Sequence, residues 1–267
     1  MRWEHLNRLL ETICETLPDS VFALVRTLYR ILRYRELVLF IPRRSAWLVL
    51  RKGSRFFEPT PRAAAKLALG HDYEKLFAVR PGDIVLDVGS GIGEYALYFA
   101  RKVAKNGLVI AIEPEPKNAT SLRANVRLYR MHNIVTVEKA VWNRKCTLAL
   151  YLHKGISEHS VIADQGGKNS VMIEAQTLDN IVSDLGIRSV DFLKMDIEGA
   201  ELEALEGAHS VLNLTKKIVV AAYHSRDGKT TCERVCQILR QRGFEVRPTD
   251  DGLVHAARSS ARVTESE

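Results

Sequence analysis

Cysteine is scarce in this sequence, and long apolar runs are missing. The four cysteines, Cys14, Cys146, Cys232 and Cys236, form no Cys-x-x-Cys pair, so their spacing gives little indication of a metal site. Reduced thiols in a cytoplasmic protein are the simplest interpretation. No run reaches the roughly 18 consecutive apolar residues that a transmembrane helix needs. The N-terminus also has no small-residue cleavage site after an apolar core, so we expect no secretory signal.

The sequence is organised around residues 83–93, which read Asp-Ile-Val-Leu-Asp-Val-Gly-Ser-Gly-Ile-Gly. The apolar run at their start predicts a buried parallel strand. Three glycines at alternate positions, Gly89, Gly91 and Gly93, indicate a tight turn where the backbone comes close to a ligand. Apolar residues then recur at helical spacing over 94–104. The segment therefore predicts strand, turn and helix, which is the context that a nucleotide-type motif requires.

The spacing of these glycines excludes two common motifs. The phosphate-binding pattern Gly-x-x-x-x-Gly-Lys-Ser/Thr is absent, and Glu94 stands where the dinucleotide pattern needs its third glycine. A carboxylate at this helix start would repel a pyrophosphate. S-adenosylmethionine (SAM), an adenosine with a sulfonium and an amino-acid tail, carries no pyrophosphate. We therefore predict a SAM site that includes Asp87 and Ser90 beside the three glycines.

A second apolar run, residues 108–112, ends in Glu113 and Pro114. Glu113 follows Gly93 by 20 residues, the offset at which doubly wound folds place a carboxylate against ribose hydroxyls. A carboxylate can accept two hydrogen bonds from such a diol, although a solvated residue at a strand end is the alternative. Ala140 and Val141 follow a third predicted strand, where small apolar groups suit an adenine ring. Ordinary core packing explains these two residues equally well.

Two carboxylates follow the fourth predicted strand, residues 189–195. Asp196 and Glu198 thus stand at the carboxyl edge of the sheet, where open α/β sheets bind ligands. They can orient a hydroxyl, accept its proton or bind a divalent metal, and acids that stabilise a helix start are the alternative. His224 follows the fifth predicted strand and can take a proton near neutral pH or serve a structural role. The residues leave open whether a metal binds.

The remaining elements complete one α/β domain between two extensions. A polar segment, residues 154–169, can carry substrate specificity, with His159 and Ser160 as candidate contacts or as parts of a mobile loop. We divide the chain into a basic extension (1–60), an α/β domain (61–258) and a disordered tail (259–267). Helices are predicted over 3–17, 20–35, 62–77, 94–104, 116–129, 178–185 and 231–242. The third and fifth strands are predicted over 133–138 and 217–223. Further strands are predicted over 37–41, 46–50, 146–152, 170–175, 244–247 and 253–257.

The basic extension holds most of the excess positive charge. Residues 1–60 contain 11 Lys or Arg and 6 Asp or Glu, so +5 of the net charge of +7 lies there. An amphipathic basic helix can lie on an anionic membrane surface, and contact through residues 1–55 is one interpretation. A basic solvated face is the other. A cytoplasmic location, with peripheral membrane contact as an option, fits both.

Three motifs together resemble the FkbM family of SAM-dependent methyltransferases. They are Asp87-Val88-Gly89 with Ile92-Gly93, Glu113-Pro114, and the most specific of the three, Lys194-Met195-Asp196-Ile197-Glu198-Gly199-Ala200-Glu201. The resemblance covers about residues 70–247. It implies a Rossmann-like class I methyltransferase fold, a seven-stranded, mostly parallel sheet with an antiparallel seventh strand. It also implies methyl transfer from SAM to a hydroxyl of a sugar or small metabolite.

Two other functions stay open at this point. The basic charge fits an RNA or protein N-methyltransferase, but the Asn/Asp-Pro-Pro-Tyr pattern is absent after the fourth strand, so nucleic acid is the less favoured partner. A non-catalytic SAM-binding protein, anchored by its N-terminal helices, is the second. The sequence does not predict an oligomeric state.

Overall fold

The computed structural model describes residues 18, 20–21, 23–24, 28, 38–42, 47–51, 54–58, 73–152, 159–162, 169–226 and 228–258. The chain divides into two compact units, Met1–Ala68 and Leu69–Glu267. In the first unit, β1 (Val38–Pro42), β2 (Trp47–Arg51) and β3 (Ser54–Glu58) form an antiparallel sheet in that order. The strands predicted over 37–41 and 46–50 are thus confirmed and pair as a hairpin, and β3 adds a strand to it. The predicted helix at 3–17 and the predicted tail at 259–267 lie outside the described residues.

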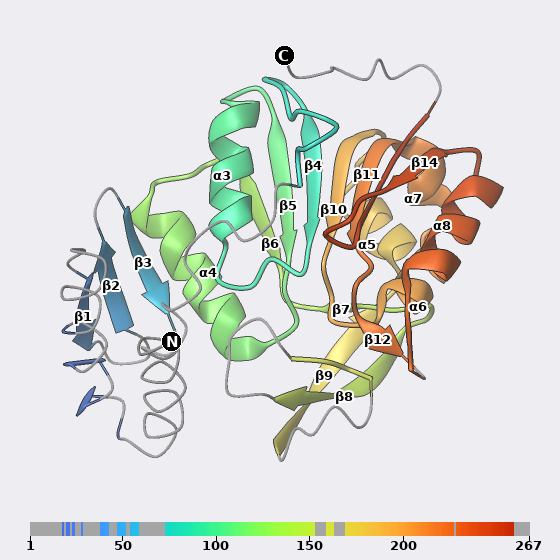
Figure 1. The fold of residues 1–267 in the computed structure, drawn as a ribbon. Coiled ribbons are helices and arrows are strands. Elements are labelled where there is room, and N and C mark those ends of the chain that lie inside the picture. Colours follow the sequence, from blue (N-terminus) through green and yellow to red (C-terminus); the bar gives the residue numbers. More distant parts are fainter. Residues whose placement is uncertain are drawn as a thin grey trace. The chain divides into compact units, whose positions relative to one another are not determined.

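A seven-stranded sheet forms the centre of the second unit (Figure 1). The strands lie in the order β14-β15-β11-β10-β4-β5-β6. Neighbours are parallel except at β15, which is antiparallel to both β11 and β14. The predicted sheet is therefore confirmed, including its antiparallel last strand. The strands are β4 (Ile84–Val88), β5 (Leu108–Ile112), β6 (Ile134–Val137), β10 (Val190–Met195), β11 (Thr215–Ala221), β14 (Glu245–Pro248) and β15 (Leu253–Ala257).

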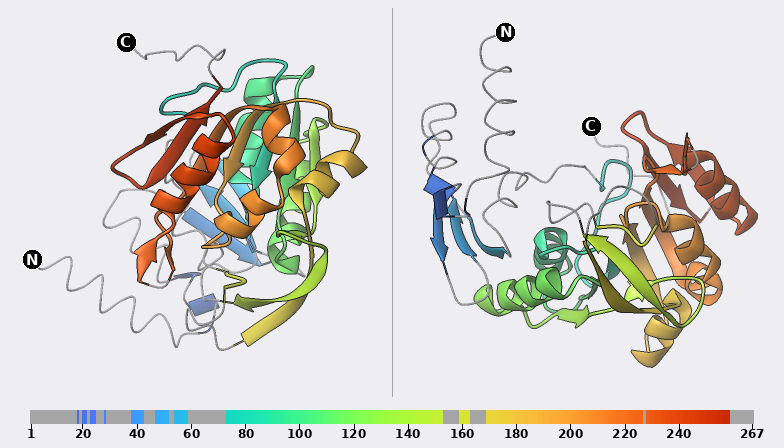
Figure 2. Two further views of the ribbon diagram at one scale, coloured as in Figure 1. Left: turned by 90° about the vertical axis from the view of Figure 1, so that its right-hand side faces the viewer. Right: turned by 90° about the horizontal axis from the view of Figure 1, so that it is seen from below.

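Helices cover both faces of this sheet (Figure 1, Figure 2). Alternate residues of a strand point to opposite faces, and Leu86 and Val85 of β4 accordingly belong to two separate apolar clusters. The Leu86 cluster takes side chains from α5 (Leu178–Asp184), α6 (Glu201–Glu206), α7 (His209–Leu214) and α8 (Cys232–Gln241). The Val85 cluster takes them from α3 (Glu94–Val103) and α4 (Pro116–Leu128). None of the helices in the described part of the chain is long and apolar enough to cross a membrane.

Two small sheets complete the unit. One joins β7 (Ala140–Val141), β9 (Asn169–Gln176) and β8 (Cys146–Leu152) in that order. In Figure 1 it lies beneath the main sheet, on the side toward which β5 points. The other is the short pair β12 (Ser225–Arg226) and β13 (Lys229–Thr230). The first of these sheets therefore lies near the carboxyl edge of the main sheet, where the candidate site is.

The helix predicted over 62–77 is wrong in its described part. Residues 73–77 form turns and bends, whereas 62–72 lie outside the described residues. The Glu74 carboxylate accepts a hydrogen bond from the backbone N–H of Val79 at 2.5 Å and so holds a compact turn. Tyr73 is buried with its ring centroid 4.7 Å from that of Tyr95 on α3. Packing against α3 thus overrides local helix propensity here.

Candidate active site

The three glycines of the turn after β4 differ in what surrounds them. A Cβ at Gly89 would lie 1.8 Å from the carbonyl oxygen of Asp196, and one at Gly93 would lie 2.5 Å from a methyl carbon of Leu122. Packing inside the protein therefore explains the need for glycine at these two positions. At Gly91, where φ is 55°, a Cβ would meet nothing within 4 Å. Open space thus lies beside the backbone at the middle glycine of the turn.

Glu113 lies beside this open space. Its Oε2 accepts the backbone N–H of Gly91 at 2.8 Å, and its Oε1 accepts that of Glu115 at 3.0 Å. Burial raises the pKa of this carboxyl to about 7. Each oxygen keeps acceptor capacity, so the carboxylate fits a ribose diol placed beside Gly91. Pro114, the next residue, is half-buried and precedes α4.

Asp87 is fully buried, and Lys194 lies beside it. The two residues are partners in the register of β4 and β10. Lys194 Nζ lies 3.0 Å from Asp87 Oδ1 and donates to the Gly89 carbonyl at 2.7 Å. Burial lowers the pKa of Lys194, but Asp87 and Asp196 more than offset this and raise it. Ser90 donates its hydroxyl to the Asp87 carbonyl at 2.7 Å, so Asp87 and Ser90 order the turn.

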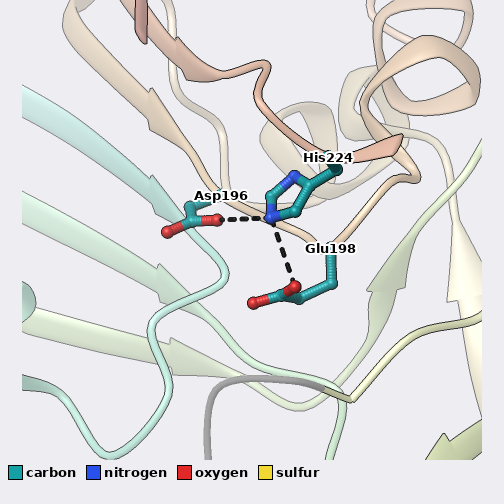
Figure 3. Close-up of side chains that lie close together, drawn as sticks. All are labelled: Asp196, Glu198 and His224. Carbon is teal, nitrogen blue, oxygen red and sulfur yellow. Dashed lines mark ion pairs between the residues drawn. The ribbon is translucent and has the colours of Figure 1, made fainter. Parts of the chain in front are cut away.

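Three predicted catalytic side chains meet at the carboxyl edge of the sheet (Figure 3). Asp196 and Glu198 follow β10, and His224 follows β11. His224 Nε2 lies 3.2 Å from Glu198 Oε2 and 3.7 Å from Asp196 Oδ1. The cluster adjoins the glycine turn, because the backbone N–H of Asp196 donates to the Val88 carbonyl at 3.0 Å. The candidate cofactor turn and the candidate catalytic groups are therefore neighbours.

A third carboxylate holds the other side of the imidazole. Glu201 is fully buried, and its Oε1 lies 2.8 Å from His224 Nδ1 and accepts the backbone N–H of Gly199 at 3.0 Å. Burial lowers the pKa of His224, but the carboxylates of Glu198 and Glu201 more than offset this and raise it to about 10. Burial also raises the pKa of Glu198. Glu201 thus joins the loop after β10 to the loop after β11.

Hydrogen bonds from residues outside the cluster hold Asp196 and Glu198 in place. The Tyr73 hydroxyl donates to Asp196 Oδ2 at 2.6 Å, and that of Tyr223 lies 3.5 Å from the same oxygen. The Ser160 hydroxyl donates to the Glu198 carbonyl at 2.6 Å. Glu198 has a φ of 55°, an uncommon value for a residue other than glycine. The cluster is therefore held from several sides.

Sequence reasoning missed several of these residues as site residues. Lys194 had a usable signal, because a lysine interrupts the otherwise apolar end of the strand Val-Asp-Phe-Leu-Lys-Met. Glu201 lies within the most specific motif, but nothing in the sequence pairs it with His224. Tyr73 and Tyr223 belong to no motif. Ser160, predicted as a substrate contact, is buried and donates its hydroxyl within the protein, and its neighbour His159 is half-buried.

Ala140 and Val141 lie in the interior, each 4% exposed. Ala140 packs in a small cluster with Leu150, and Val141 packs in the main core with Leu178. Both form β7, which pairs with β9 in the small sheet and is not part of the main sheet. Their contact with an adenine ring stays a prediction.

Comparisons with known proteins agree with this geometry. The model of the methyltransferase FkbM domain matches residues 87–246. The 31-O-demethyl-FK506 methyltransferase FkbM of Streptomyces tacrolimicus is 28% identical over 204 residues, which cover 66% of this chain and 77% of that protein. The 2-O-methyltransferase NoeI of Sinorhizobium fredii is 26% identical over 159 residues, 52% of this chain and 63% of that protein.

Two larger proteins contain a related region. The AMB antimetabolite synthetase AmbE of Pseudomonas aeruginosa is 26% identical over 213 residues, 65% of this chain but 10% of its own length. The crystal structure of a methyltransferase FkbM from Methylobacillus flagellatus shares the fold, with a TM-score of 0.50 and 22% identity. That match covers 70% of this chain and 48% of the solved chain. This chain thus spans about half of the solved protein and a tenth of AmbE.

The matched region of the domain model is more than half of the chain, and it begins at the buried Asp87 and includes Glu113, Asp196 and His224. The chain belongs to the FkbM family of SAM-dependent methyltransferases.

Proposed function

We propose that this protein transfers a methyl group from SAM to a hydroxyl oxygen of a small molecule or a glycan. SAM supplies a methyl group on a positively charged sulfur. The observation that carries the proposal is the meeting of Asp196, Glu198 and His224 beside the glycine turn. Two relatives, FkbM and NoeI, are O-methyltransferases by name, which favours oxygen as the acceptor atom here.

The glycine turn and Glu113 are the groups that would hold SAM. Gly91 leaves open space beside its backbone, and Glu113 presents carboxylate oxygens next to that space. The Ser90 hydroxyl bonds to the Asp87 carbonyl and so orders the turn. Lys194 contacts both the Asp87 carboxylate and the Gly89 carbonyl. The turn is thus organised before a ligand arrives, which lowers the entropic cost of binding.

The carboxylate cluster supplies what a hydroxyl acceptor needs. A neutral hydroxyl is a weak nucleophile, and it must lose its proton as the new oxygen–carbon bond forms. When ionised, Asp196 and Glu198 act only as hydrogen-bond acceptors, so they can orient an O–H group and take its proton. His224, whose pKa is raised to about 10, is protonated near neutral pH and can hold the acceptor oxygen by donating a hydrogen bond. Tyr73 and Glu201 keep these groups in place. Much of the acceleration then comes from holding the acceptor oxygen in line with the methyl group.

Matched acceptors test the proposal. The full chain is incubated with methyl-labelled SAM and with pairs of sugars and polyols that differ only in a hydroxyl or an amino group. We expect label on oxygen, located by mass spectrometry. Asp196→Asn should lower the transfer rate roughly 10²- to 10⁴-fold, the range for a lost acid–base group. Glu206→Gln, which removes an exposed carboxylate of α6, is the control and should transfer normally.

The results separate the alternatives. Label on nitrogen alone would favour an N-methyltransferase, and nucleic-acid affinity that falls steeply with salt would point to RNA as its substrate. Saturable SAM binding without transfer to any acceptor would favour a non-catalytic SAM-binding protein. Full activity of Asp196→Asn would remove Asp196 from the proton-accepting role.

A further inference from the structure

The cluster of Asp196, Glu198 and His224 has the spacing of a metal site. One ligand atom from each residue lies within 4.8 Å of the other two. His224 Nε2 stands 3.2 Å from Glu198 Oε2 and 3.7 Å from Asp196 Oδ1. Neighbouring ligands around an octahedral ion with bonds of about 2.1 Å are about 3 Å apart. These three atoms therefore need to move little to surround one cation.

Two of the three atoms have no hydrogen-bond partner outside the cluster. His224 is 9% exposed, and within the described part of the chain its Nε2 faces only the carboxylate oxygens of Glu198 and Asp196, while Asp196 Oδ1 has no hydrogen bond. Most buried side-chain polar atoms do have one. Both atoms point toward the same place, between the loops that follow β10 and β11 (Figure 3). This convergence is a second observation, independent of residue type, that points to a missing ligand.

Each member of the cluster is also oriented by an outer partner. Glu201 lies at Nδ1 of His224, so the proton that stays on the ring when Nε2 gives up its own proton to a cation is the one on Nδ1. Tyr73 binds the far oxygen of Asp196, and Ser160 fixes the carbonyl of Glu198. A carboxylate behind a ligating histidine, and hydrogen bonds behind ligating carboxylates, are recurrent features of metal sites.

We propose that Asp196, Glu198 and His224 bind one divalent cation of the Mn²⁺ or Mg²⁺ class. Two carboxylates and one imidazole, without a thiolate, suit hard or borderline ions. Three protein ligands leave coordination positions open for water or for an acceptor oxygen. The role in holding the acceptor rests on the proposed function, and there the cation would lower the pKa of the acceptor hydroxyl. The binding of the cation itself does not depend on that function.

Mn²⁺ titration of the metal-free full chain, without SAM or acceptor, tests the site. Free Mn²⁺ is measured by electron paramagnetic resonance, and we expect one bound ion per chain that Mg²⁺ displaces. Asp196→Asn and Glu198→Gln should each weaken binding at least tenfold. Glu201→Gln should weaken it roughly 10- to 100-fold, as other outer partners do. Glu206→Gln is the matched control and should bind like the wild type.

A spectroscopic signature tests the histidine separately. Pulsed electron paramagnetic resonance of the Mn²⁺-loaded protein should show coupling of the Mn²⁺ electrons to a nitrogen nucleus. His224→Gln should abolish this coupling. Thermal melting followed by circular dichroism establishes whether each variant is folded. If His224→Gln is unfolded, the isosteric variants Asp196→Asn and Glu198→Gln test the site in its place. Wild-type protein that leaves Mn²⁺ free, or binding unchanged in both isosteric variants, would overturn the proposal. Methyl transfer that persists in a chelator would then leave the proposed function standing without a metal.

Discussion

Single glycines in the turn after β4 can be tested for separate roles. Gly91 and Gly82 both have positive φ, 55° and 89°, and a Cβ at either position meets nothing within 4 Å. Alanine at either site should therefore cost about 1–2 kcal/mol of stability through backbone strain alone. Only Gly91 adjoins Glu113. We expect Gly91→Ala to weaken SAM binding at least tenfold in calorimetry, and Gly82→Ala to bind normally. Equal affinities would show that the open space at Gly91 is not the ligand site.

The protonation of Glu113 should make SAM affinity depend on pH. Burial raises its pKa to about 7, and Glu115 and Lys194 are the charged groups that influence it. Ribose hydroxyls donate to the ionised carboxylate, so binding favours that form. Affinity should be constant above about pH 8 and about tenfold weaker at about pH 6. At a pH one unit below its pKa, a carboxyl group is roughly nine-tenths protonated, so only about a tenth of the protein carries the ionised form that binds.

Two variants assign this pH dependence. Glu113→Gln should bind SAM weakly at every pH, with a flat profile in calorimetric titration. Glu94 also has a pKa raised to about 7 by burial, so Glu94→Gln is the control and should keep the pH dependence. A flat profile in Glu94→Gln instead would assign the titration to Glu94.

At the scale of elements, the pair Asp87–Lys194 joins the neighbouring strands β4 and β10 inside the protein. Lys194→Met leaves a carboxylate buried without its cation, which should cost about 3–5 kcal/mol in urea denaturation. The double variant Asp87→Asn/Lys194→Met should recover part of this loss. Lys216 pairs with Asp191 at 2.6 Å but is 62% exposed, and Lys216→Met should cost less than about 1 kcal/mol. Additive effects of Asp87→Asn and Lys194→Met would show that the pair is not coupled.

The sequence predicts most elements of the second unit, because each strand is an apolar run bounded by turn residues. The seven strands of the main sheet and helices α3, α4, α5 and α8 lie within a few residues of the predicted ranges. The turns at 73–77 and the short helix α7 depend on contacts far along the chain, which local patterns do not record. The same holds for β7, whose residues pair with residues of β9 that lie 35 positions further along the sequence. Tertiary packing decides these elements.

Only the part of the candidate site that lies at the carboxyl ends of the strands could be predicted from the sequence. Parallel strands present their carboxyl ends at one edge, so Asp196, Glu198 and His224 could be expected to meet. The rule says nothing about side chains that arrive from elsewhere. Tyr73 reaches Asp196 across 123 positions, and Glu201 reaches His224 across 23. Contacts of this kind follow from the folded chain and have no local signal.

At the scale of the molecule, the second unit contains every residue of the candidate site. Its parts come from the turn after β4, the ends of β5, β10 and β11, and the segment around Tyr73. The basic residues concentrated in 1–60 belong to the other unit. Contact of residues 1–55 with an anionic membrane stays a prediction, as do the domain limits at 60 and 258. Co-sedimentation of the full chain with anionic and neutral liposomes would test the membrane contact.

The position of β15 sets the order in which this sheet can be completed during synthesis. Among the strands of the described residues, β15 comes last in sequence, yet it lies between β11 and β14. In the described part of the chain, β14 pairs with β15 alone, so it emerges from the ribosome before its partner exists. Five parallel strands can associate first, while β14 waits for residues 253–257. A chain that stalls or is cut before Leu253 leaves the edge of β11 unpaired, and such an edge is a template for pairing with other chains.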